Sequence, residues 1–159
     1  MDKKLIKAAA IATLGAALCG GAIAAGERGS EAEAQAMAKK AVAAIKADGA
    51  EKAYKAFTEH PDGAFKDRDL YVFAIDMEGN TLAHGGNPKL VGKNAMGMKD
   101  ADGNLFVKGM VEKFKTEKSG WYGPYKFTNP NSQGYEMKKS YCEQGGANIL
   151  VCVGIYTTK

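Results

Sequence analysis

The stretch that decides the fold is GWYGPYKFTNPNSQGYEMKKSYCEQGGANILVCVGIY, residues 120–156. It holds three strand-like runs, 121–128, 135–143 and 148–156, which are separated by the turn-forming segments 129–134 and 144–146. Short connections of this kind join antiparallel neighbours, whereas parallel strands need a long crossover. The stretch therefore predicts an antiparallel meander.

Simple alternation along the meander predicts one aromatic face with a lysine in it, because successive strand side chains point to opposite faces. Two sets of alternating positions meet on that face: Trp121, Tyr125 and Phe127, and Tyr135, Met137, Lys139 and Tyr141. A lysine buried among rings needs a partner for its charge, and an anionic ligand would supply one. The alternative is a solvated Lys139 beside ordinary core rings, which the residue types alone favour slightly, and the two interpretations stay open at this point.

As a set, the motifs of the meander resemble the single Cache domain of bacterial extracytoplasmic sensors, in its second single-Cache type. The resemblance covers nearly all of the chain after its first 25 residues, and an Asp-Gly segment followed by Phe106 precedes the meander as in that family. The positions that match are Tyr125, Phe127, Asn129, Pro130, Lys139, Ser140, Tyr141, Gly154 and Tyr156.

The resemblance implies an α+β, PAS-like Cache fold. Such a fold has a long N-terminal helix packed on an antiparallel sheet of about five strands, with a further helix and loops over the ligand face. It also implies a periplasmic domain that binds a small organic acid in signal transduction. In this interpretation Trp121, Tyr125 and Phe127 wall the pocket, while His84, Lys139 and Tyr141 hold the carboxylate. Phe127 stands where many relatives have Trp, which leaves the ligand itself open.

The resemblance also bears on partners. Cache domains generally sit between two membrane helices, whereas this chain ends three residues after Tyr156. We therefore expect a free-standing domain that presents its ligand to a membrane-bound sensor kinase or chemoreceptor, or that buffers the ligand. The alternative is a partner-binding regulatory subunit with a vestigial pocket. Family members often pair through their N-terminal helices, which suggests a homodimer.

His84 has two interpretations. It is the last residue of the strand-like segment 81–84, in the sequence Ala-His that the family also carries near its pocket. By resemblance it donates a hydrogen bond to a ligand carboxylate. From the residues alone, a single histidine at a strand end is as often simply half-buried.

The first 25 residues read as a signal peptide. Lys3, Lys4 and Lys7 precede an apolar run over 8–18, which is too short to span a bilayer, and small residues follow at 22–25. The sequence thus predicts export to the periplasm and one domain over 26–159. An uncleaved anchor, or lipid attachment at Cys19, is the less favoured alternative. Removing the leader lowers the net charge from +4 to +2, which gives no argument for nucleic acid as a partner.

Ahead of the meander, the sequence predicts two helical regions and two strands. Ser30 with Glu33 forms a capping box at the start of a helical region to about Phe57, which Gly49 interrupts. Strands are expected over 70–76 and 81–84, and a helix over 105–118, where Phe106, Met110 and Phe114 recur every four residues.

Cys142 and Cys152 fall on the last two strands, nearly opposite one another. A disulfide across the strands suits an oxidising periplasm, and two small buried side chains are the alternative. No CxxCH, CxxC, HExxH or GxSxG motif occurs in the chain. We therefore expect no cofactor, no metal and no enzymatic activity, with a small periplasmic hydrolase as the less favoured alternative.

Overall fold

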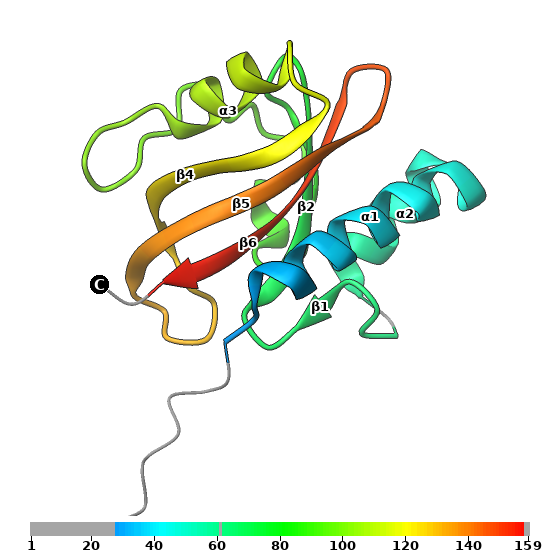
Figure 1. Ribbon diagram of the computed structural model, residues 1–159, viewed down its shortest axis with the longest axis horizontal. Helices are drawn as coiled ribbons and strands as arrows, with labels where there is room; N and C mark the ends of the chain where they lie inside the picture. The colour runs from blue at the N-terminus through cyan, green and yellow to red at the C-terminus, as the bar shows by residue number, and fades with distance from the viewer. Residues whose placement is uncertain (1–27, 61, 158–159) are drawn as a thin grey trace, which may run out of the picture.

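The computed structural model describes residues 28–60 and 62–157, and these build helices on an antiparallel sheet (Figure 1). The predicted leader over 1–25, with Cys19, lies outside the described residues. The six-stranded sheet has the order β1-β2-β6-β5-β4, and β3 pairs with β2 as well. Its strands are β1 (Lys66–Asp67), β2 (Leu70–Asp76), β3 (Thr81–His84), β4 (Ser119–Thr128), β5 (Tyr135–Gly146) and β6 (Ile149–Thr157). The predicted α+β fold and the meander are confirmed.

The N-terminal helical region consists of two helices, α1 (Glu31–Asp48) and α2 (Ala50–Glu59). The capping box is present, because Ser30 accepts a hydrogen bond from the Glu33 backbone while the Glu33 side chain accepts from the Ser30 backbone. Gly49 separates the helices with a φ of 85°, a conformation that glycine adopts readily. The predicted start and interruption of this region are therefore both correct.

Both faces of the sheet are covered, by different elements. Helices α1 and α2 pack on one face, and α3 (Phe106–Phe114) lies on the other with the segment that holds the short helix η1 (Pro88–Leu90) (Figure 1). Strand β2 shows the consequence, since six of its seven residues are buried. Leu70 and Val72 face the α1 and α2 side, and Tyr71 and Phe73 face the α3 side.

Strand β4 contains a bulge that changes which of its side chains share a face. Tyr122 pairs with Ser140, and Tyr125 pairs with Lys138, so three steps along β4 match two steps along β5. The extra residue falls at Gly123–Pro124, and a β-bulge reverses the alternation beyond it. Trp121 therefore faces α1, whereas Tyr125 and Phe127 face α3.

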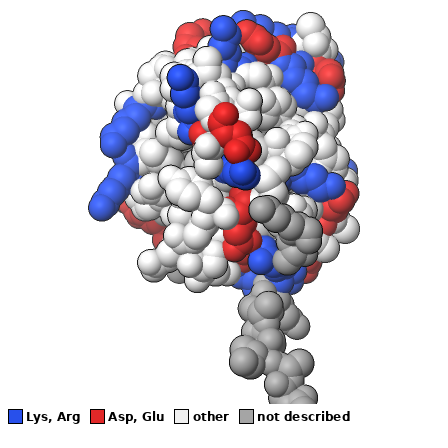
Figure 2. All heavy atoms as spheres, turned by 90° about the vertical axis from the view of Figure 1, so that its left-hand side faces the viewer, with Lys and Arg blue, Asp and Glu red and all other residues white. Residues whose placement is uncertain are grey.

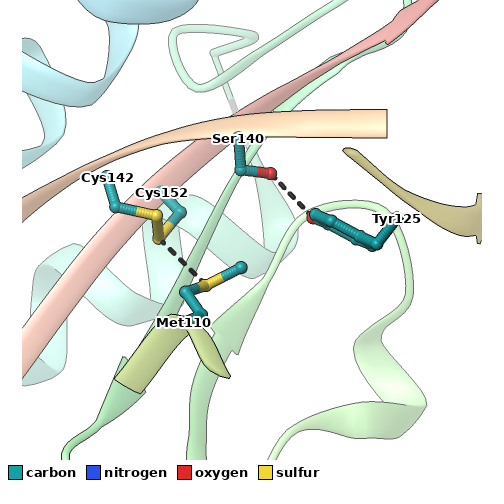
Figure 3. Close-up of a disulfide and its surroundings, with 5 residues drawn as sticks. All are labelled: Met110, Tyr125, Ser140, Cys142 and Cys152. Atoms are coloured by element: carbon teal, nitrogen blue, oxygen red, sulfur yellow. Dashed lines mark hydrogen bonds between the residues drawn. A yellow bond between two sulfur atoms is a disulfide. The ribbon is translucent and has the colours of Figure 1, made fainter. Parts of the chain in front are cut away.

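A disulfide joins β5 to β6 next to α3. Cys142 and Cys152 are register partners with Cα atoms 4.1 Å apart, and both side chains are fully buried. The Sδ atom of Met110, from α3, lies 3.8 Å from the Cys152 sulfur (Figure 3). Of the two predicted alternatives for these cysteines, the structure contains the disulfide.

Candidate functional site

A cavity of about 30 Å³ lies between the sheet and the elements that cover its α3 face. This volume has room for two or three water molecules. Most of its wall is apolar, and polar groups enter from His84, Thr81, Tyr125 and Lys138. The apolar lining residues are Phe73, Ile75, Leu90, Ala95, Met98, Phe106, Val107 and Phe127.

Lys138 is the charged residue of the cavity. It lies in the middle of β5 and points to the α3 face with only 1% of its surface exposed. Its Nζ donates a hydrogen bond to the hydroxyl of Tyr71 at 2.6 Å and stands 4.1 Å from the centre of that ring. The rings of Tyr156, Phe127 and Phe73 lie 4.9, 5.1 and 5.3 Å from the same atom.

No carboxylate among the described residues pairs with Lys138, and its surroundings change its titration. Burial away from water lowers the pKa of Lys138 to about 7, and the more distant charge of Asp69 opposes this only in part. Cation–π contacts with four rings stabilise the ammonium group, but they replace only part of its hydration. The lysine is thus a buried cation that no carboxylate of residues 28–60 and 62–157 pairs with.

His84 supplies a second polar group with a defined tautomer. Its Nδ1 accepts a hydrogen bond from the Asn87 backbone N–H at 2.9 Å, so in the neutral ring Nε2 carries the proton. Burial, together with the charge of Lys138, lowers the pKa of His84 to about 3. The ring also stacks 5.7 Å from Phe73. His84 therefore stays neutral and offers one N–H donor at the cavity.

Three tyrosine hydroxyls at the site form hydrogen bonds with residues of the neighbouring strands. Tyr71 and Tyr156 share a hydrogen bond of 3.0 Å, and Tyr156 donates to the carbonyl of Thr128 at 2.8 Å. Tyr125 and Ser140 share a bond of 2.7 Å (Figure 3). Burial raises the pKa of all three tyrosines, so these hydroxyls remain protonated at neutral pH.

Gly154 on β6 makes the space that the lysine stem occupies. A Cβ atom at this position would lie 2.0 Å from Cε of Lys138 and 2.7 Å from Oγ of Ser140. Real Cβ contacts are never this close, so any larger residue forces the lysine or the strand to move. The site thus depends on a glycine on the strand next to the lysine.

The predicted site residues divide between the two faces of the sheet. His84, Tyr125 and Phe127 line the cavity. Trp121, Lys139 and Tyr141 lie on the α1 side, where Trp121 and Tyr141 pack edge to face and Lys139 pairs with Glu31 and stands 4.9 Å from the Trp121 ring. The interpretation that placed these three with Tyr125 is therefore wrong about the shared face, and its cause is the bulge at Gly123–Pro124.

The simple alternation missed Lys138, Tyr71 and Tyr156. A signal for the bulge was available, because a proline inside a strand marks an edge or a bulge. Moving the alternation by one residue after Pro124 leaves Tyr125 opposite Lys138 and Phe127 opposite Glu136, both even-numbered positions of β5. No signal in the sequence identifies Tyr71, since it lies in a strand that is apolar on both faces.

The family model for Single Cache domain 2 matches residues 23–158 of this chain. The chain belongs to this family. No curated protein sequence matches it.

Solved structures with the same fold include three sensor domains. A methyl-accepting chemotaxis protein from Vibrio parahaemolyticus RIMD 2210633 superposes with a TM-score of 0.62 at 24% identity, over 79% of this chain and 86% of that one. A periplasmic sensor domain of a chemotaxis protein gives 0.61 at 23% identity, over 78% and 88%. A Cache chemosensory domain described for carboxylic acid recognition gives 0.64 at 21%, over 80% and 92%. At these identities the likeness shows the fold.

Two further properties concern residues 28–60 and 62–157 alone. No helix in this part of the Cache domain is long and apolar enough to span a bilayer. Within the same residues, no group of His, Cys, Asp and Glu side chains is arranged to hold a metal ion.

Replacing Gly154 with alanine tests the space next to the lysine. We expect Gly154→Ala to lower the free energy of unfolding by about 1–3 kcal/mol, because the added methyl group overpacks the site. Gly97→Ala is the matched control, since no atom lies within 4 Å of its added Cβ. Urea unfolding measures both variants, and equal stabilities would contradict the packing described here.

Replacing Lys138 with methionine tests its buried charge. Folding lowers the pKa of Lys138 from 10.5 to about 7. Between pH 7 and pH 10 the unfolded chain therefore binds a proton on Lys138 that the folded protein lacks. As the pH rises through this range, Lys138 makes the wild type more stable. The Lys138→Met variant has no group that titrates at this position, so its stability lacks this pH dependence. Its stability advantage over the wild type should therefore shrink with rising pH, by at most about 1.4 kcal/mol per pH unit.

Urea unfolding at pH 7, 8 and 9 measures this difference. Lys139→Met, which changes the neighbouring residue on the other face, should differ from the wild type by the same amount at all three values. A constant difference for Lys138→Met as well would show that Lys138 keeps its ordinary pKa.

Proposed function

We propose that this Cache domain is a periplasmic sensor module that binds a short-chain monocarboxylate. The observation that carries the proposal is Lys138, a buried ammonium group with no carboxylate partner among the described residues, which lines the same cavity as the N–H donor His84. A carboxylate accepts hydrogen bonds from both groups and compensates the charge. Hydrogen bonds between charged groups in a low-dielectric site are stronger than those at a surface.

The size and lining of the cavity favour the smallest acids. About 30 Å³ suits a carboxylate with a short apolar tail, which would pack against Phe106, Phe127 and Val107. A dicarboxylate would bury a second charge against apolar side chains, and this costs several kcal/mol without a partner. An amino acid would bring a second ammonium group close to Lys138. Acetate, propionate, pyruvate and lactate are therefore the candidates.

The structural relatives support this class of ligand and a role in signalling. One of them is a Cache domain described for carboxylic acid recognition, and the other two belong to chemotaxis proteins. We infer that the domain reports its ligand to a membrane-bound chemoreceptor or sensor kinase. No catalytic role is proposed, because the polar groups at the cavity are suited to holding an anion.

A thermal-shift screen tests the ligand class. A ligand at about 100 times its dissociation constant stabilises the folded state by about 2.7 kcal/mol, which raises the melting temperature measurably. We expect acetate, propionate, pyruvate or lactate to raise the melting temperature and succinate and glycine to leave it unchanged. Lys138→Met should abolish the shift, because it removes the charge that holds the carboxylate.

Lys139→Met is the matched control, since it deletes the same charge one residue away on the α1 face. It should retain the full shift. A shift that survives Lys138→Met and disappears in Lys139→Met would overturn the assignment of the site. The absence of a shift with every acid would instead favour a partner-binding domain with a vestigial pocket.

A further inference from the structure

The groups that face Lys138 are all neutral. Strand β2 contributes Tyr71, β3 contributes His84, β4 contributes Tyr125, and β6 contributes Tyr156. Helix α3 and the segment that contains η1 contribute only apolar side chains to this wall. A charge on Lys138 is therefore compensated by no opposite charge at the cavity until an anion enters.

The acid whose charge acts on Lys138 does not line the cavity. Asp69 precedes β2 and is 1% exposed, and its Oδ1 accepts a hydrogen bond from the Gly29 backbone at 2.7 Å. It forms no ion pair with Lys138. Asp69 thus favours the charged lysine at a distance but does not take the place of a bound carboxylate.

From this arrangement, which rests on the function proposed above, we propose that the pocket takes up a proton together with its carboxylate. Lys138 accepts the proton on Nζ, and the ligand anion supplies the charge that keeps it there. Above neutral pH the domain then responds to the anion and the proton jointly, which is to say to the amount of undissociated acid.

Whether ligand affinity rises or falls with pH follows from the protonation of Lys138 with and without ligand. In the empty pocket, burial sets the pKa of Lys138 at about 7, and an adjacent carboxylate raises it. Above pH 7 the lysine must therefore gain a proton on binding, and ligand affinity falls up to tenfold for each further pH unit. Below pH 7 the lysine is already charged, and affinity levels off until the acid itself becomes protonated.

The other titratable groups that face Lys138 do not take up a proton near neutral pH. The pKa of His84 is lowered to about 3, and burial raises the pKa values of Tyr71, Tyr125 and Tyr156. None of these four changes its charge between about pH 5 and 9. Proton uptake in this range therefore reports Lys138.

Isothermal titration calorimetry with acetate, and in parallel with propionate, measures the proton directly. At each pH the binding enthalpy is compared in two buffers that differ in ionisation enthalpy, such as HEPES and Tris at pH 8, and the difference gives the number of protons taken up. With a pKa of about 7 in the empty pocket, we expect about 0.9 proton per ligand at pH 8 and about 0.1 at pH 6.

Two variants identify the proton acceptor. Lys139→Met should reproduce the wild-type uptake at both pH values. Tyr71→Phe removes the hydroxyl that accepts the hydrogen bond from Lys138, which lowers the pKa of the lysine further and should raise the uptake at pH 7 from about one half towards one. Unchanged uptake in Tyr71→Phe would contradict Lys138 as the acceptor.

The experiment separates this inference from the function on which it rests. Binding of acetate or propionate at pH 8 with the same enthalpy in both buffers would overturn proton uptake and leave the carboxylate site standing. No binding of either acid at pH 6 and pH 8 would overturn the carboxylate function and the inference together.

Discussion

The site is built around one ammonium group that is buried among aromatic rings and pairs with no carboxylate of the described residues. Lys138 is 1% exposed, hydrogen-bonds to a tyrosine hydroxyl and has four rings within 5.3 Å. Such a group costs folding free energy, because a charge leaves water for partners that compensate it only in part. Methionine at this position would fill a similar space without this cost to the free energy of folding. In the proposed function, the unbalanced charge makes the cavity selective for an anion.

The rest of the fold holds this group in place from several sides. Strands β4, β5 and β6 run side by side (Figure 1). Lys138 is the register partner of both Tyr125 and Tyr156, which face the α3 side. Gly154 leaves room for the lysine stem, and the disulfide between Cys142 and Cys152 joins β5 to β6 close to it. On the outer surface, basic and acidic side chains are interspersed over the face shown in Figure 2. The buried charge of Lys138, by contrast, has no carboxylate partner among the described residues.

Much of the fold follows from local signals in the sequence. The capping box at Ser30, the glycine at position 49 and the turns between the last three strands each act within a few residues, and each is where the sequence places it. The meander also brings Cys142 opposite Cys152. The helix expected over 105–118 is shorter, ending at Phe114, and the sheet gains the two-residue strand β1 beside β2, which leaves little trace in composition.

The site is harder to predict, because one inserted residue moves every later side chain of a strand to the other face. Tyr125 and Phe127, predicted to wall a ligand pocket, and His84, predicted to hold the ligand, all lie at the cavity. Without the bulge at Gly123–Pro124, strict alternation from the Trp121–Tyr141 pair predicts Lys139, and not Lys138, on the face of Tyr125. Which of two adjacent lysines is buried is decided by register between strands, and register depends on contacts that are distant in sequence.

A crystal structure of the protein grown with acetate tests the central claim most directly, because it locates the anion. The account predicts a carboxylate within hydrogen-bonding distance of Nζ of Lys138 and Nε2 of His84, with its methyl group toward Phe106 and Phe127. Acetate bound at another place, such as beside Lys139 on the α1 face, would contradict it.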